Sequence, residues 1–184
     1  MKPTQPLHSK RDIGEDRGMG QQSRLEMRPY RAADYERVLE ICIAAFEPIH
    51  QGFEAELGQQ IFALQYNDWK ERYAATIRTV APDDEKIKVY VAVLDGRVAG
   101  FIFLLIDAKR QTGELGLNAV DPPLQGIGIG KAMYQFALAT LKEHGALIAC
   151  VGTGGDDAHA RARRAYAAAG FDRGIPGVYL FKSL

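Results

Sequence analysis

Three alternating glycines directly before a predicted helix form the segment that most clearly suggests chemistry. Gly126, Gly128 and Gly130 lie between Gln125 and Lys131. Glycine leaves the neighbouring backbone N–H groups uncovered, and the first N–H groups of a helix have no partner within the helix. These groups and the helix dipole favour a negative charge. The segment therefore predicts a loop that binds phosphate.

Two common nucleotide-binding motifs contain such glycines, and neither fits the spacing. A Walker A loop requires glycine five positions before Gly130 and Ser or Thr after Lys131, where this sequence has Gln125 and Ala132. A dinucleotide-binding fingerprint requires its third glycine three positions after the second, where this sequence has Lys131 or Met133. A structural alternative stays open, in which the glycines only form a tight turn between a strand and a helix.

The remaining pattern is Gln-x-x-Gly-x-Gly after a strand that ends at Val120, and it resembles the coenzyme A loop of the GNAT superfamily of N-acetyltransferases. The resemblance is close over residues 113–171. It implies that the backbone of Ala119 and Val120 pairs with the pantetheine arm, beside a splay between two adjacent strands. It also implies that loop N–H groups hold the pyrophosphate, and the loop comprises Gln125, Gly126, Ile127, Gly128, Ile129, Gly130 and Lys131.

A second motif lies downstream of the loop. Ala162, Tyr166, Gly170 and Phe171 look like the Ala-x-x-x-Tyr-x-x-x-Gly-Phe helix of the same family. The family often has Asn three positions before that alanine, whereas this sequence has His159, whose ring is still able to donate a hydrogen bond to the cofactor. Two motifs at the expected separation are more specific than one. The resemblance thus implies acetyl-CoA as the acyl donor.

Tyr166 is the predicted proton donor of the reaction. The thiol of CoA has a pKa near ~8.5, so the departing thiolate gains from a nearby phenol. The family match supports this role. The alternative is a buried tyrosine with an ordinary hydrogen bond on the alanine stripe of the helix.

Glu114 is the predicted general base. At pH 7 a lysine-like amine with a pKa of ~10.4 costs about 4.6 kcal/mol to deprotonate, so a base is helpful. Period-two alternation would place Glu114, Gly116, Asn118 and Val120 on one face of a strand. The position resembles that of the glutamate base in some family members. A glutamate that only faces solvent at the start of the strand is equally compatible with the sequence.

Hydrophobic periodicity predicts the elements that position these residues. Asp95-Gly96 is typical of a tight hairpin turn. Strands are predicted at residues 25–30, 87–94, 98–106, 113–120, 146–151 and 178–182. Helices are predicted at residues 35–46, at 53–77 with a break near 67–68, at 128–145 and at 156–170. The expected fold is α/β, with one GNAT-like domain over residues 25–184 and a mixed, mostly antiparallel sheet that is splayed at the cofactor site and has helices on both faces.

Composition restricts the partners. Twenty-three Lys plus Arg balance twenty-three Asp plus Glu, so the net charge gives no reason to expect nucleic acid or an anionic membrane surface as a partner. No stretch approaches the ~18 apolar residues of a membrane span, and the N-terminus lacks an apolar signal region. We expect a cytoplasmic protein without a membrane partner. Residues 1–24 are almost devoid of apolar side chains and are predicted to form a flexible tail.

Cysteine and histidine residues predict neither disulfides nor a metal site. Cys42 and Cys150 both lie in apolar runs, which is typical of buried, reduced thiols. The four histidines lack metal-ligand spacing. Acceptor selection is expected from the segment between the first strand and the hairpin, although most of its large side chains fit a core equally well: Phe46, Ile49, His50, Phe53 and Trp69.

The sequence thus favours acetyl transfer from acetyl-CoA to a primary amine by direct attack on the thioester. An acyl-CoA-binding sensor without turnover is the alternative from another class. A longer acyl group, such as succinyl or propionyl, is also compatible, because the loop recognises only coenzyme A. The family commonly dimerises, and a homodimer is left open by the sequence.

Overall fold

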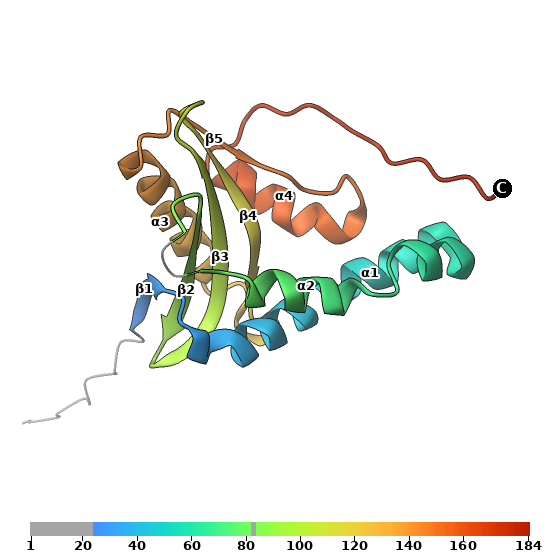
Figure 1. Ribbon diagram of the computed structural model, residues 1–184, viewed down its shortest axis with the longest axis horizontal. Coiled ribbons are helices and arrows are strands. Elements are labelled where there is room, and N and C mark those ends of the chain that lie inside the picture. Colours follow the sequence, from blue (N-terminus) through green and yellow to red (C-terminus); the bar gives the residue numbers. More distant parts are fainter. Residues whose placement is uncertain (1–23, 82–83) are drawn as a thin grey trace, which may run out of the picture.

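The computed structural model describes residues 24–81 and 84–184, which form one five-stranded sheet. The strand order β1-β2-β3-β4-β5 is also the order along the chain. The first three neighbouring pairs are antiparallel, and β4 and β5 are parallel. The strands are β1 (Leu25–Pro29), β2 (Ile87–Leu94), β3 (Arg97–Asp107), β4 (Thr112–Val120) and β5 (Ile148–Val151). The predicted mixed, mostly antiparallel sheet is confirmed (Figure 1).

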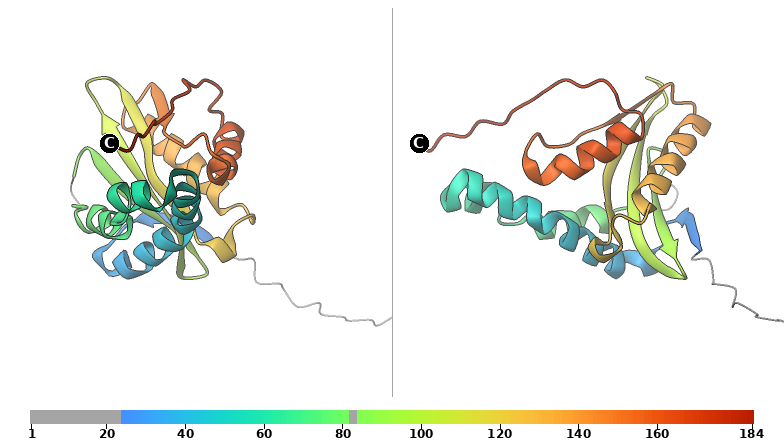
Figure 2. Two further views of the ribbon diagram at one scale, coloured as in Figure 1. Left: turned by 90° about the vertical axis from the view of Figure 1, so that its right-hand side faces the viewer. Right: turned by 180° about the vertical axis from the view of Figure 1, so that it is seen from behind.

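Helices lie on both sides of this sheet, as predicted (Figure 2). Helix α3 (Ile129–Glu143) covers one side and connects β4 to β5. Helices α1 (Tyr35–Gln65), α2 (Trp69–Arg78) and α4 (Ala160–Ala168) lie on the other side. Short 3-10 turns precede α1, α3 and α4. The mixed α/β fold expected from the sequence is therefore confirmed.

Each face of the sheet buries its own apolar cluster, because alternate side chains of a strand point to opposite faces. The cluster beneath α3 includes Ile102, Leu104, Leu115, Met133 and Leu141. The cluster beneath α1 and α2 includes Val38, Ile41, Ile77, Val91 and Phe101. The central strand β3 contributes to both clusters, so the two layers are fixed to the same strands.

A β-bulge interrupts the pairing of β3 with β4. Ile102 pairs with Asn118, whereas Leu104, two residues further, pairs with Leu115, three residues back along β4. One additional residue in β4 therefore lies opposite β3 at this point. Such an insertion reverses the inside–outside alternation of the strand beyond it.

The bulge corrects the predicted orientation of Glu114. Val120 packs against the cluster beneath α3, and Asn118 bonds to a tyrosine of that helix. A Cβ placed on Gly116 would instead meet Phe103, which belongs to the cluster beneath α1. Glu114 shares the face of Gly116, since no bulge separates them. The prediction that Glu114 lies on one face with Asn118 and Val120 is wrong.

The helix boundaries differ from the prediction in one place. The break near residues 67–68 is confirmed, because α1 ends at Gln65 and α2 begins at Trp69. The helix expected to stop near residue 46, however, continues across the second predicted segment, with a kink at Gly58, whose φ is 77°. The hairpin turn is also confirmed, since Asp95 and Gly96 both have positive φ.

Two further predictions are corrected at the open edge of the sheet. Residues 178–182 do not form a strand, and no described strand pairs with them. Cys150 is exposed rather than buried, because it lies on β5, the last strand of the described sheet, and only β4 lies beside it. Cys42 is buried as predicted. Of the residues predicted to form a flexible tail, 1–23 lie outside the described part of the chain. No helix among the described residues is long and apolar enough to cross a membrane.

Candidate active site

The parallel strands β4 and β5 separate halfway along β4. They pair only from Thr112 with Ile148 to Leu115 with Val151. Beyond Leu115, β4 continues to Val120 without a described strand on that side. A cavity of about 740 Å³ lies at this opening, between β4, the start of α3, α4 and part of α1. This volume is in the range of small-molecule sites, and the predicted splay is present.

The glycine loop forms the wall of the cavity at the start of α3. Gly126 and Gly128 have φ values of 92° and 100°, a left-handed conformation that favours glycine. Gly128 is the N-cap residue of α3, and no side chain caps the helix. The first N–H groups of α3 therefore have no side-chain acceptor. An uncapped N-terminus next to a cavity is the arrangement that binds an anion.

The predicted loop residues divide into two groups. Gln125, Gly126, Gly128, Gly130 and Lys131 line the cavity, as do Ala119 and Val120 of β4. Ile127 is exposed outside it, and Ile129 is buried in the core beneath α3. Only the backbone of these two isoleucines is suited to the predicted role.

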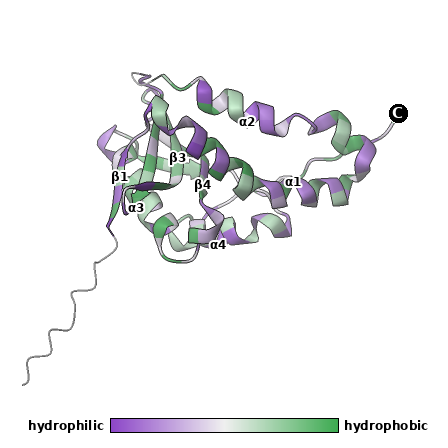
Figure 3. Ribbon diagram, turned by 90° about the horizontal axis from the view of Figure 1, so that it is seen from below, coloured by the Kyte–Doolittle hydropathy of each residue, from purple (hydrophilic) through white to green (hydrophobic). Residues whose placement is uncertain are grey.

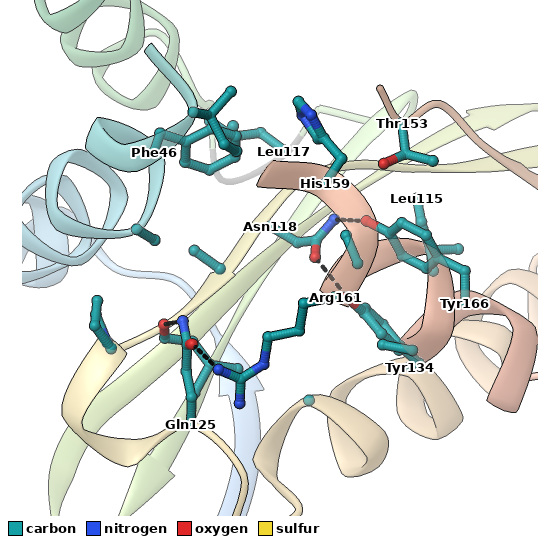
Figure 4. Close-up of a pocket in the computed structure, with 18 of the residues that line it drawn as sticks. Phe46, Leu115, Leu117, Asn118, Gln125, Tyr134, Thr153, His159, Arg161 and Tyr166 are labelled. Carbon is teal, nitrogen blue, oxygen red and sulfur yellow. Dashed lines mark hydrogen bonds between the residues drawn. The ribbon is translucent and has the colours of Figure 1, made fainter. Parts of the chain in front are cut away.

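Arg161 is a site residue that the sequence interpretation missed. Its Nη1 donates a hydrogen bond of 2.6 Å to Oε1 of Gln125, and Nε2 of Gln125 donates to the carbonyl of Val120 at 3.0 Å. This chain of bonds connects α4, the glycine loop and the end of β4 (Figure 4). It places a guanidinium beside the uncapped helix start. The available signal was the basic run that includes Arg161, Arg163 and Arg164 at the beginning of the last helix.

His159 lines the cavity at the start of α4, whereas Tyr166 lies near the end of this helix. Its Nδ1 lies 2.6 Å from Oδ2 of Asp156, and its backbone N–H donates to Oδ1 of the same carboxylate at 3.2 Å. Burial acts to raise the pKa of Asp156, but the hydrogen bonds and the charge of His159 lower it overall. Asp156 therefore fixes the ring of His159 at the edge of the cavity.

Tyr166 projects from α4 into the cavity and is 7% exposed. Its hydroxyl lies 3.1 Å from Nδ2 of Asn118, and the hydroxyl of Tyr134 donates to Oδ1 of Asn118 at 3.0 Å. The rings of Tyr134 and Tyr166 are 5.1 Å apart. Burial raises the pKa of Tyr134. Three polar side chains from β4, α3 and α4 thus meet at the opening (Figure 4).

The amide of Asn118 determines the direction of these hydrogen bonds. Its Nδ2 also donates to the carbonyl of Gly116 at 2.8 Å, and a carbonyl only accepts. The amide nitrogen is thereby identified, so the oxygen of Tyr166 accepts from Asn118. The Tyr166 hydroxyl therefore does not donate its proton to Asn118.

Glu114 lies at the end of the cavity where β4 and β5 are still paired. Its side chain is exposed. Burial raises the pKa of the adjacent Cys150 thiol, and the charge of Glu114 raises it to a lesser extent. It is the one carboxylate that lines the cavity among the described residues. Its role as a base stays a prediction.

The aromatic residues predicted for acceptor selection divide between the cavity and the core. Phe46 and Ile49 of α1 line the cavity. His50 instead stacks on Trp69 with ring centroids 4.1 Å apart, in a cluster between α1 and α2. Burial lowers the pKa of His50 to about 4, and its Nδ1 has no hydrogen-bond partner among the described residues. The cluster joins α1 to α2, and the two helices form an arm beside the sheet (Figure 3).

Neither metal ligands nor a close curated relative adds to this description. In the described part of the chain, no group of three or more His, Cys, Asp or Glu side chains is arranged to hold a metal ion. No curated protein sequence matches the chain closely enough to show a relationship.

The sequence profile of the Acetyltransferase (GNAT) family matches residues 46–171, which is more than half of the chain. The chain belongs to the GNAT acetyltransferase family. The GNAT match contains the glycine loop, the open end of β4 and the tyrosine helix. Family membership confirms the predicted acyl donor, acetyl-CoA, and does not favour a sensor without turnover.

Several solved structures share this GNAT fold. The PaiA N-acetyltransferase from Thermoplasma acidophilum in complex with coenzyme A is 22% identical, with a TM-score of 0.63 over 81% of this chain and 90% of that one. The aminoglycoside N-acetyltransferase AAC(6')-Iy in complex with CoA is 13% identical, with a TM-score of 0.63 over 91% and 100%. An aminoglycoside acetyltransferase from an uncultured soil metagenomic sample, in complex with sisomicin, is 16% identical, with a TM-score of 0.55 over 87% and 96%.

Proposed function

We propose that this chain transfers the acetyl group of acetyl-CoA to a primary amine of a small molecule or peptide, as a cytoplasmic enzyme. The observation that carries the proposal is the cavity between β4, α3 and α4. It has an uncapped helix start and a guanidinium at one side, and a buried tyrosine hydroxyl at the other (Figure 4). The helix start and the guanidinium suit an anionic cofactor, and the tyrosine hydroxyl suits a proton transfer step at some distance from the phosphates.

In this proposal the N–H groups of residues 126–131 bind the pyrophosphate of CoA. The backbone of Ala119 and Val120, on the unpaired part of β4, holds the pantetheine arm. His159, fixed by Asp156, contacts the cofactor at the edge of the cavity. A binding mode that uses mostly backbone groups tolerates many side chains, which accounts for Ile127 and Ile129 lying outside the cavity.

The proposed reaction forms one bond and breaks another. The nitrogen of the neutral amine bonds to the acetyl carbon, and the carbon–sulfur bond breaks. The amine proton passes to a base, for which Glu114 or a water beside it is the candidate. The hydroxyl of Tyr166 donates its proton to the sulfur, since its oxygen already accepts from Asn118. Proton transfer of this kind contributes roughly 10²–10⁴ to a rate.

The proposal is tested by measuring thiol release from acetyl-CoA with three amines: sisomicin, a peptide with a free α-amine and a peptide with a lysine side chain. Sisomicin is included because a similar structure contains it. We expect amine-dependent release of CoA and an acetylated product by mass spectrometry. The matched control for each amine is its fully N-acetylated form, which has no free amine left to accept an acetyl group. Folded protein that fails to bind acetyl-CoA in calorimetry would contradict the proposal.

Substitution of Arg161 tests the charge beside the loop. We expect Arg161→Gln to weaken acetyl-CoA binding about tenfold, because a charge-assisted contact worth about 1.4 kcal/mol is lost. The loss should shrink at high ionic strength, since salt screens exposed charges. The control is Arg164→Gln, an exposed arginine of the same helix that does not line the cavity. Equal affinities of the two variants in calorimetry would exclude Arg161 from the site.

A further inference from the structure

The side of the cavity that α1 forms is apolar. Helix α1 lines it with five residues that carry no charged or polar side chain: Ala44, Ala45, Phe46, Pro48 and Ile49. Leu117 of β4 adds a further apolar side chain (Figure 4). These six residues are called the α1 wall below. Such a surface is suited to contact with the apolar part of a ligand.

Ile49 lines this wall without serving the packing of the fold. Its side chain is half-buried, yet it packs in neither of the two core clusters. Its neighbour His50 is buried and stacks on Trp69, so it faces the other helix of the arm. Ile49 lies three residues after Phe46, and residues at this spacing are neighbours on one face of a helix. The two side chains therefore offer one continuous apolar surface to the cavity.

The α1 wall is held in position by aromatic contacts on two sides. The ring of Phe46 lies 4.9 Å from the ring of Tyr73 in α2, measured between centroids. Beyond the wall, the ring of Phe53 lies 6.2 Å from that of His159, which lines the cavity at the start of α4. A wall that is already ordered selects ligands by polarity without a further cost in conformational entropy.

The charged groups of the cavity lie away from the α1 wall. Lys131 and Arg161 belong to the side of the glycine loop, where the phosphates are proposed to bind. Glu114, the one carboxylate among the described lining residues, lies where β4 and β5 are paired. One ammonium group would therefore find a partner. A second ammonium group would meet either cations or apolar side chains, and a charge buried without a partner is costly.

We propose that the acceptor is a primary amine with one positive charge and an apolar alkyl or aryl body, which packs on Phe46, Ile49 and Leu117. The inference rests on the proposed acetyl transfer, because coenzyme A then occupies the glycine loop and the unpaired part of β4. The α1 wall is the part of the cavity that is left for the acceptor. Ile49 is in this view a residue that determines specificity.

Three alkylamines of similar basicity test the wall: ethylamine, hexylamine and 1,6-diaminohexane. We expect kcat/KM for hexylamine to exceed that for ethylamine at least about tenfold, because each buried methylene contributes about fourfold. Hexylamine and 1,6-diaminohexane share one carbon chain and differ at the far end only. The diamine is expected to be at least about tenfold poorer, because its second ammonium group would lie against the wall. Thiol release from acetyl-CoA measures all three rates.

Substitutions of Ile49 test the position of the acceptor. Ile49→Asp should lower the ratio of kcat/KM for hexylamine to that for the diamine at least about tenfold, since the new carboxylate would pair with the second ammonium group. Ile49→Ala adds no charge and should lower the ratio of hexylamine to ethylamine about threefold. Both ratios are independent of the fraction of folded protein. The control is Leu64→Asp, on the same helix, because Leu64 is 78% exposed and does not line the cavity.

The outcomes separate this inference from the proposed function. A wild type that uses the diamine or ethylamine as well as hexylamine would overturn the apolar acceptor and leave acetyl transfer standing. Turnover of sisomicin or of a peptide without turnover of hexylamine would do the same. Ratios that neither Ile49 variant changes relative to Leu64→Asp would also contradict the inference. Absence of an acetylated product from every amine would overturn both proposals.

Discussion

Replacement of Gly128 by glutamate is expected to lower the affinity for acetyl-CoA by roughly 5- to 1,000-fold. Gly128 is the N-cap of α3 and lines the cavity, so the new carboxylate would lie where the pyrophosphate is proposed to bind. Two like charges about 4 Å apart repel by roughly 1–4 kcal/mol, and 1.4 kcal/mol corresponds to tenfold in affinity. Calorimetric titration of both proteins measures the difference.

A matched control exists at the opposite end of the same helix. Gly145 follows α3 and has a φ of 85°, and a Cβ at either glycine would have nothing within 4 Å. Gly145→Glu therefore introduces the same residue and similar backbone strain, about 1–2 kcal/mol, without a charge in the cavity. Its affinity should equal that of the wild type. Equal losses of affinity in both variants would indicate that the substitutions act on folding. Unchanged affinity in Gly128→Glu would indicate that the glycines only form a structural turn.

Removal of the Tyr166 hydroxyl is expected to lower kcat at least about 100-fold and to leave acetyl-CoA affinity within about threefold of the wild type. Phenylalanine keeps the ring that packs against Tyr134 and Phe171 but removes the proposed proton donor. Steady-state kinetics, beside calorimetry, measures both effects.

Two further variants separate proton donation from packing. Tyr134→Phe removes the same atom from the other tyrosine on Asn118, and we expect less than about a tenfold loss of kcat. Asn118→Asp keeps Tyr166 but converts its donor into an acceptor, which would draw the phenol proton away from the cavity. A large loss of kcat is expected there too. If Tyr166→Phe retains full activity, Tyr166 is only a packing residue.

The parts of the site that depend on neighbouring residues could be predicted from the sequence. Gly126 and Gly128 have left-handed backbone conformations directly before a helix start, and both features are local properties. The hairpin at Asp95-Gly96 is local in the same sense. The order of strands and helices followed from periodicity, because each element buries one face or one stripe.

Predictions that assumed a regular continuation of the local sequence pattern were wrong. The face of Glu114 was derived from strict alternation, which the bulge in β4 reverses. Residues 178–182 have the composition of a strand, but a strand forms only where a partner edge is in reach, and composition does not supply one. Cys150 lies in an apolar run, yet the position of β5 at the sheet edge exposes it.

The sequence by itself determined the fold class, the family resemblance and the position of the glycine loop before α3, since these rest on short-range patterns. Only the tertiary structure decided which side chains surround the cavity. Asn118 meets Tyr166 across 48 residues, and Arg161 meets Gln125 across 36. Such contacts depend on where the crossover through α3 returns the chain and how far β4 and β5 separate. The return point of the chain and the separation of the two strands are set by the packing of the whole sheet. No single segment of the sequence contains this information.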